Sequence, residues 1–195
     1  MSLGHDTEMA LVGAVELVNT SPAVRGTEGL GDLAALASFV SARDISEVSS
    51  LTDSDLVAVH RVRAKLAAIL AELAELADLA ELANVASAST AINALIAEAG
   101  TTPRLTDHDG YPLHIHYFTP GARLAEHLAA DCGMALAHLL TAGEADRVGR
   151  CAAPDCHRLL IDFSRNRSRR YCDERTCGNR IHVAAYRQRR RASAG

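Results

Sequence analysis

Four cysteines near the end of the chain have the type and the spacing of a metal site. Cys151, Cys156, Cys172 and Cys177 form two C-x4-C pairs with fifteen residues between the pairs. Thiolates are strong zinc ligands, and two such pairs brought together supply four sulfurs in a tetrahedral arrangement. We expect one Zn²⁺ per chain, and a structural one, because four thiolates leave no position for a reactive water. His157 directly follows the first pair, and we expect it to contact a sulfur rather than the metal.

The same stretch is the only strongly basic part of the chain. Residues 147–195 contain 13 arginines and 4 acidic residues, whereas residues 1–146 contain 20 acidic and 7 basic residues, giving about +9 and −13. A small basic module points to a nucleic-acid partner, because guanidinium groups bind phosphates and the edges of guanine. The alternative is a solvated basic tail with no partner. The predicted contacts are Arg165, Arg167, Arg169, Arg170, Arg180, Arg187 and Arg190.

Short elements must hold these cysteines and arginines in place. The apolar run 159–163 predicts a short strand and a miniature core that is too small to fold without the metal. Residues 181–191 predict a basic helix whose length suits insertion into the major groove of DNA. Asn179 lies next to the last cysteine pair, so we expect it to orient this knuckle, with reading of an adenine as the alternative.

The larger, acidic part has the pattern of an antiparallel helical domain. Residues 8–20, 31–43 and 121–142 read as helices, and another helix begins near residue 53 with Leu56, Val59, Val62, Leu66 and Ile69 on one stripe. Leucine recurs every third residue from 70 to 82, which would spread it around one continuous helix. We therefore predict two helices that meet near Asp78 or Asn84; a partner-binding helix is the alternative. Cys132 is expected to be a buried thiol without a functional role.

Residues 102–118 predict one β-hairpin. Leu113 to Tyr117 alternate between apolar and polar side chains, and Asp109-Gly110 is a hairpin-turn dipeptide. His114 and His116 share one face of the strand, which we expect to be the solvent face. The alternative is a metal-dependent enzyme built on His108, His114 and His116, with His127 and His138 as further residues that would complete a metal site.

The cysteine module resembles the CGNR zinc-finger family over about residues 148–191. The resemblance rests on the C-x4-C pair at 151–156, Phe163-Ser164-Arg165, Arg169-Arg170-Tyr171-Cys172, Cys177-Gly-Asn-Arg180 and Tyr186-Arg187. Tyr171 stands where the family often has tryptophan and implies a structural aromatic residue. His182 stands where lysine is common, which makes one phosphate contact absent or pH-dependent.

The preceding domain is similar to the ABATE-type domain that accompanies this finger in bacterial stress-induced transcription regulators. The similarity rests on Val18-Asn19-Thr20 at the end of the first helix and on the order of helices before a hairpin. It implies a regulatory role for the domain, with Asn19 as a candidate ligand-sensing residue.

Together these features predict an α+β chain, mainly α with one β-hairpin. A helical domain at residues 1–146 is followed at 147–195 by a small treble-type zinc module that ends in a helix. The leading hypothesis is a bacterial regulator that binds duplex DNA as a homodimer, since one finger covers little DNA, and that responds to a small-molecule effector. An RNA-binding protein is the alternative, and masking of the basic module by the acidic domain is a further one.

Other classes lack their sequence signatures. We find no signal peptide and no run of ~18 apolar residues, so we expect a cytoplasmic protein without a membrane partner. A nucleophile elbow, a phosphate loop, an H-E-x-x-H motif and a dinucleotide fingerprint are also missing from the sequence, so we predict that the protein is not an enzyme.

Overall fold

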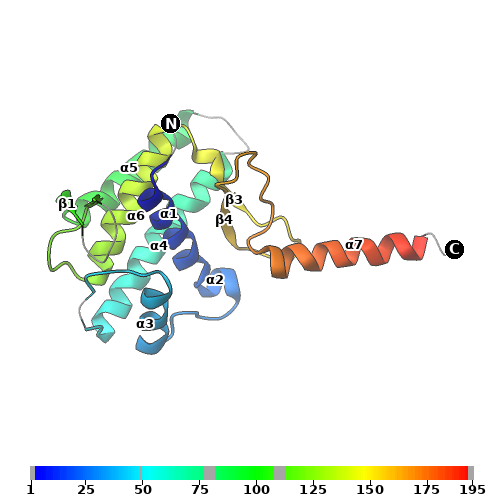
Figure 1. The fold of residues 1–195 in the computed structure, drawn as a ribbon, viewed down its shortest axis with the longest axis horizontal. Coiled ribbons are helices and arrows are strands. Elements are labelled where there is room, and N and C mark those ends of the chain that lie inside the picture. The colour runs from blue at the N-terminus through cyan, green and yellow to red at the C-terminus, as the bar shows by residue number, and fades with distance from the viewer. Residues whose placement is uncertain (1–2, 49, 77–81, 108–112, 193–195) are drawn as a thin grey trace.

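Helices form the body of the molecule, from which a basic C-terminal helix extends (Figure 1). The computed structural model describes residues 3–48, 50–76, 82–107 and 113–192. The body contains α1 (His5–Asn19), α2 (Pro22–Arg25), α3 (Leu33–Ala42), α4 (Asp53–Leu76), α5 (Leu82–Glu98) and α6 (Leu124–Thr141). The C-terminal part contains η1 (Ala145–Arg147), β3 (Val148–Arg150), β4 (Leu159–Ile161), the π-helical turn η2 (Glu174–Gly178) and α7 (Asn179–Ala192).

The prediction of a mainly helical chain with a hairpin is confirmed. The predicted hairpin consists of β1 (Arg104–Thr106) and β2 (His114–His116), which pair antiparallel with Leu105 opposite Ile115. Its expected turn at Asp109-Gly110 lies outside the described residues. A second antiparallel pair joins β3 to β4, and no pattern in the sequence marks β3 because three residues are too few to show alternation. None of the described helices is long and apolar enough to cross a membrane.

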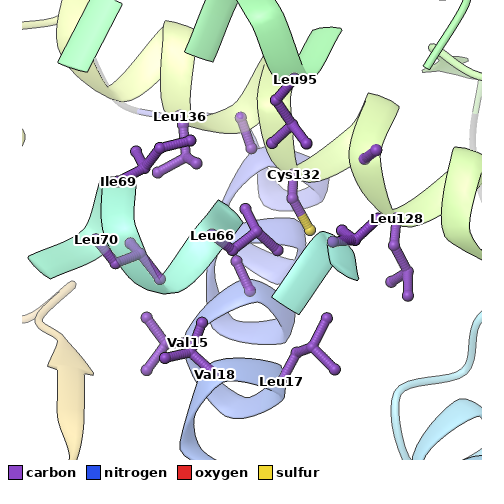
Figure 2. Packing of buried hydrophobic residues seen from close by; sticks show 14 of the residues in the cluster. Val15, Leu17, Val18, Leu66, Ile69, Leu70, Leu95, Leu128, Cys132 and Leu136 are labelled. Atoms are coloured by element: carbon purple, nitrogen blue, oxygen red, sulfur yellow. The ribbon is translucent and has the colours of Figure 1, made fainter. Parts of the chain in front are cut away.

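Helix α4 runs through the core and carries the predicted apolar stripe. Val59, Leu66 and Ile69 are fully or almost fully buried, Val62 is buried, and Leu56 is partly buried. Figure 2 shows Leu66 and Ile69 packed between α1 and α6. Burial of a Leu or Ile side chain contributes about 1.5–3 kcal/mol, so this stripe is a main source of the stability of the body.

The leucine repeat belongs to two helices, as predicted. Helix α4 ends at Leu76 and α5 begins at Leu82, so the expected join at Asp78 falls among the undescribed residues, while Asn84 already lies inside α5. Leu70 and Leu73 are fully buried in the core. Leu70 and Leu73 therefore belong to the buried stripe of α4, and Leu82 begins a second helix, so the repeat does not cover one helix with leucine.

An ion pair joins the N-terminal ends of α4 and α6. Thr52 donates its backbone N–H and its hydroxyl to Asp55 Oδ2, at 2.8 and 2.6 Å. Arg123, the N-cap residue of α6, donates to both oxygens of the same carboxylate, at 2.8 and 2.6 Å. The hydrogen bond from Arg123 outweighs the effect of burial and holds the pKa of Asp55 well below its usual range. The Asp55 carboxylate thus makes a capping-box contact at the start of α4 and also fixes α4 to α6.

Cys132 lies on α6 and packs in the core of the helical body, as predicted. Its side chain is 2% exposed, and its sulfur points toward Leu66 and Leu128 (Figure 2). The next residue, Gly133, faces α5 so closely that an added Cβ would lie 2.8 Å from Cγ1 of Ile96. Close packing of α5 on α6 therefore requires a glycine at this position.

The predicted orientation of the β1–β2 hairpin is wrong. His116 is only 7% exposed, whereas Leu105, Leu113 and Ile115 are 67%, 67% and 44% exposed. The ring of His116 packs against Phe118 at 4.7 Å between centroids, and Phe118 packs against His127 at 3.7 Å. Alternation shows which residues share a face but not which face turns inward, and an imidazole ring packs well on aromatic neighbours.

The second hairpin also differs from expectation in what it packs against. Val148, Leu159 and Ile161 belong to the same core cluster as α1, α4 and α6. The predicted miniature core is limited to Cys151, Ala153 and Tyr171, with the other cysteines and Ile181 around them. The strand predicted at 159–163 is present, but it stabilises the junction with the helical body rather than an isolated module.

Candidate metal centre and nucleic-acid interface

The four predicted cysteines converge at one point. Their sulfurs all lie within 4.8 Å of one another, although the two pairs come from opposite ends of the 151–177 segment. Cys156 Sγ is 3.7 Å from Cys172 Sγ, which is 3.8 Å from Cys177 Sγ. A tetrahedral ion with Zn–S bonds of about 2.3 Å places its sulfurs about 3.8 Å apart. The geometry therefore fits one structural Zn²⁺, and this cofactor assignment agrees with the prediction.

The electrostatics of the sulfurs also call for a cation. Burial, together with the neighbouring sulfurs, raises the pKa of the Cys172 and Cys177 thiols. Burial opposes ionisation of Cys151 as well, but the backbone N–H groups of Ala153 and Cys172 donate to its sulfur and lower its pKa. Several thiolates cannot remain charged side by side without compensation, and a bound dication provides it.

The residues expected around the metal take different positions. Tyr171 is buried against Cys151, with its ring 6.1 Å from that of His182 in an edge-on arrangement. Asn179 donates from its side-chain amide to the carbonyl oxygen of Arg175 at 3.2 Å, which links the start of α7 to η2. His157 is exposed and does not belong to the cluster of ligand atoms.

All seven arginines predicted to contact nucleic acid are exposed, but they have different surroundings. Arg180, Arg187 and Arg190 lie on α7, which projects away from the body (Figure 1). On a helix, positions 180, 187 and 191 fall within about 40° of one another. Arg191 therefore joins Arg180 and Arg187 in one basic stripe, a contribution that the candidate set from the sequence omits.

Two of the other arginines are engaged inside the protein. Arg167 forms ion pairs with Asp146 and, at 3.0 Å, with Glu144. Arg169 donates to the carbonyl oxygens of Ile161 and Cys172, at 3.2 and 2.7 Å, and these bonds fold the loop back onto β4.

Asp162 organises this arginine loop, and the sequence does not single it out. Its side chain accepts hydrogen bonds from the backbone N–H groups of Ser164 and Arg169, both at 2.7 Å. Burial opposes its ionisation, but the Ser164 and Arg169 donors lower its pKa. The only signal in the sequence is that an acidic residue stands just before a run of arginines.

Asn19 connects the helical body to the zinc module. Its side-chain amide donates to the carbonyl oxygen of Leu159 and its side-chain oxygen accepts from the Leu159 N–H, both at 2.9 Å. This pairing imitates that of a neighbouring β-strand and holds β4 against the C-terminal end of α1. The ligand-sensing role of Asn19 stays a prediction, and the side chain does not line the cavity described next.

A cavity of about 420 Å³ lies in the helical body. It is lined by the first half of α1, residues 43–46 after α3, strand β2 and one face of α6. Its wall contains His116, His127 and Asp131, and His127 Nε2 lies 2.9 Å from Asp131 Oδ2. The i,i+4 spacing of the last two residues on α6 is the signal in the sequence that could have revealed this pair.

The hairpin histidines meet each other but do not form a metal cluster. His114 Nε2 and His116 Nε2 are 2.9 Å apart, and His138 Nε2 contacts the Tyr117 hydroxyl at 3.1 Å. Within the described part of the chain, the four cysteines are the only group of three or more His, Cys, Asp or Glu side chains with converging ligand atoms. His108 lies outside that part.

Two protein-family models match the chain. The ABATE model, described as "Putative stress-induced transcription regulator", matches residues 13–143, and the CGNR zinc finger model matches residues 147–190. A search of curated proteins gives no match.

Proposed function

The chain belongs to the ABATE family and carries a CGNR zinc finger, and from this premise we propose that it is a transcription regulator that binds duplex DNA. The observation that carries the proposal is the basic helix α7, which extends from the metal centre. Its 14 residues correspond to a length of about 21 Å, and the major groove, about 12 Å wide, admits one helix. The stripe formed by Arg180, Arg187 and Arg191 would face the DNA.

The zinc centre gives this helix a fixed starting point. Cys177 lies in η2, directly before α7, and Asn179 holds the first turn of α7 to η2. Because a structural metal folds a small module that has little core of its own, loss of zinc would release the helix. We propose that Arg165 and Arg170, which are exposed on the loop between the cysteine pairs, add phosphate contacts.

The salt dependence of DNA binding tests this assignment. Each phosphate contact contributes about 0.9 to the slope of log affinity against log salt concentration. We expect Arg187→Ala to weaken binding and to make the negative slope shallower by about 0.9, the contribution of one phosphate contact. Fluorescence anisotropy with a labelled duplex measures both changes. Arg167→Ala is the matched control, because that guanidinium already pairs with Glu144 and Asp146. Equal effects of the two variants would rule out α7 as the main DNA contact.

We propose that the protein acts as a homodimer. One zinc module buries little DNA surface, so useful specificity needs two modules on two half-sites. Leu105, Leu113 and Ile115 form an exposed apolar face on the hairpin, which supports association through the N-terminal domain. Light scattering at high micromolar concentration should give a dimer that Leu105→Lys weakens. A monomeric wild-type protein would contradict this part of the proposal.

RNA is a weaker candidate partner. Single-stranded RNA is bound largely by stacking of bases on exposed aromatic side chains. Of the three aromatic residues in the zinc module, Tyr171 is buried and Phe163 packs against the main core, while Tyr186 is 54% exposed. Competition between a duplex and a single-stranded RNA of the same length would decide between the two partners.

The acidic domain is proposed to sense a signal rather than to catalyse a reaction. The matched families describe a regulator and a zinc finger, and the cavity beside β2 has a volume typical of small-molecule sites. Figure 1 shows α7 pointing away from this domain, so the acidic domain does not cover it in this conformation. We place the protein in the cytoplasm, where its thiols stay reduced and can hold zinc.

A further inference from the structure

Helix α6 and strand β2 contribute buried residues to the lining of the cavity, and the start of α1 contributes exposed ones. Among the lining residues, His116 and His127 are each 7% exposed, whereas His5 and Asp6 at the start of α1 are exposed. Aromatic, histidine and aliphatic side chains make up much of the lining, including Phe39, Ile45 and Leu128. Such a lining suits a compact ligand with an apolar or aromatic body.

The charges around the cavity favour a cation. Asp6, Asp44 and Asp131 line it, whereas Arg43 is the one basic residue other than histidine among the lining residues. Arg43 is already paired with Glu16, its Nε lying 3.0 Å from Glu16 Oε2. Apart from the histidines, the lining carries three carboxylates and one guanidinium, and Glu16 offsets the charge of that guanidinium.

The acidic groups act on the interior of the cavity. Burial raises the pKa of the Tyr117 hydroxyl, and the charges of Asp131 and Asp6 raise it further. The same Asp131 charge adds to burial in raising the pKa of the Cys132 thiol. Both groups line the cavity, so the field that disfavours a new negative charge there would stabilise a positive one.

We infer that this cavity binds a small organic cation, an amine attached to an apolar or aromatic body. The ammonium group would lie near Asp131, and the apolar body would pack against the aromatic side chains and α6. The inference deepens the sensing role proposed above, and the ligand's action as an effector rests on that proposed function. Ligand binding itself does not depend on DNA.

Isothermal titration calorimetry of the zinc-loaded protein without DNA tests the inference with three matched probes. Tryptamine, tryptophol and indole-3-propionate share a ring system and differ in the charge of the side chain. We expect tryptamine to bind at least about tenfold more tightly than tryptophol, and indole-3-propionate to bind more weakly than either. Lack of tryptamine binding at about 10 mM, or equal affinities for the three probes, would overturn the inference.

Variants identify the carboxylate responsible. Asp131→Asn keeps an oxygen that can accept from His127, and we expect it to weaken tryptamine binding at least about tenfold while it changes tryptophol binding less than about twofold. Asp6→Asn changes an exposed residue, so it should keep the fold and reduce the preference for tryptamine in the same direction. Glu98→Gln, which removes a negative charge outside the cavity, is the control and should change neither affinity. Equal losses for tryptamine and tryptophol in both aspartate variants would show that no charge is recognised. Because no DNA is present, a failed DNA-binding experiment would leave these outcomes unaffected.

Discussion

Replacement of Asn19 by alanine should loosen the junction between the helical body and the zinc module. The side chain of Asn19 makes two hydrogen bonds with the backbone of Leu159, both 2.9 Å long. Leu159 is 3% exposed and packs in the main core, so water has little access to its N–H and carbonyl groups once the amide is removed. The variant therefore loses two bonds and leaves a donor and an acceptor without these partners.

The expected cost follows from those two groups. A hydrogen bond contributes a net ~1 kcal/mol to stability, and a buried polar group left unsatisfied costs about 1–3 kcal/mol. We expect Asn19→Ala to lower the free energy of unfolding by about 2–4 kcal/mol. Asn19→Asp should cost about as much, because it keeps the size of the side chain but places a carboxylate oxygen against the Leu159 carbonyl.

Urea unfolding followed by circular dichroism, with zinc bound, measures this cost. Hydrogen exchange of the Leu159 amide should accelerate in both Asn19 variants, because its acceptor is lost or its strand is released. Asn93→Ala is the matched control, since Asn93 is exposed on α5 and its replacement should change stability by less than about 0.5 kcal/mol. If Asn19→Ala costs no more than Asn93→Ala, the pairing with Leu159 does not stabilise the junction.

Metal analysis by plasma mass spectrometry should give one zinc per chain, with most of it lost in Cys172→Ser and none lost in Cys132→Ala, whose thiol lies in the core. Retention of zinc in Cys172→Ser would contradict the four-sulfur site. Hydrogen bonding from Arg63 holds the pKa of Glu28 at about 2, below the ordinary 4.5, so this pair stabilises the fold above pH 4.5 and its contribution is lost as the pH falls toward 2. Glu28→Gln should therefore lose less stability than the wild type across that pH range in urea titrations, and equal slopes would refute the assignment. Gly133→Ala should lower stability by about 1–3 kcal/mol in thermal unfolding, because its new Cβ would lie 2.8 Å from a side-chain carbon of α5; an unchanged melting temperature would show that α5 yields easily.

The metal centre could be predicted because its chemistry is local in the sequence. Two cysteine pairs with short, equal spacings can each fold around one ion, and few arrangements other than a shared tetrahedral site satisfy all four thiolates. The same holds for α7, because its arginines begin at Arg180, three residues after the last cysteine, and cluster between residues 187 and 191. The helices of the body could also be predicted, because the period of their apolar residues indicates a helix and the side of it that is buried.

The orientation of the β1–β2 hairpin could not be predicted in this way. Alternation of Leu113 to Tyr117 correctly predicts a strand at 114–116, but the histidine face turns inward and the leucine and isoleucine face turns outward. What decides the orientation is the packing of His116 and Phe118 against His127 of α6, a contact that no local pattern in the strand records. The cavity and its acidic lining depend on the same choice.

The surroundings of the predicted DNA-contacting arginines could likewise not be predicted from the sequence. All seven are charged side chains in an arginine-rich stretch of the sequence, yet Arg167 reaches Glu144 and Asp146 while Arg187 extends on α7. The sequence by itself determined the zinc ligands, the helical class and the separation of charge, because these depend on residue type and short spacing. The tertiary structure alone decided which arginines are engaged in contacts within the protein, which face of the hairpin is buried and how Asn19 joins the two parts. Those outcomes depend on contacts between residues distant in the chain, such as the 140 positions between Asn19 and Leu159, and local sequence patterns carry no record of them.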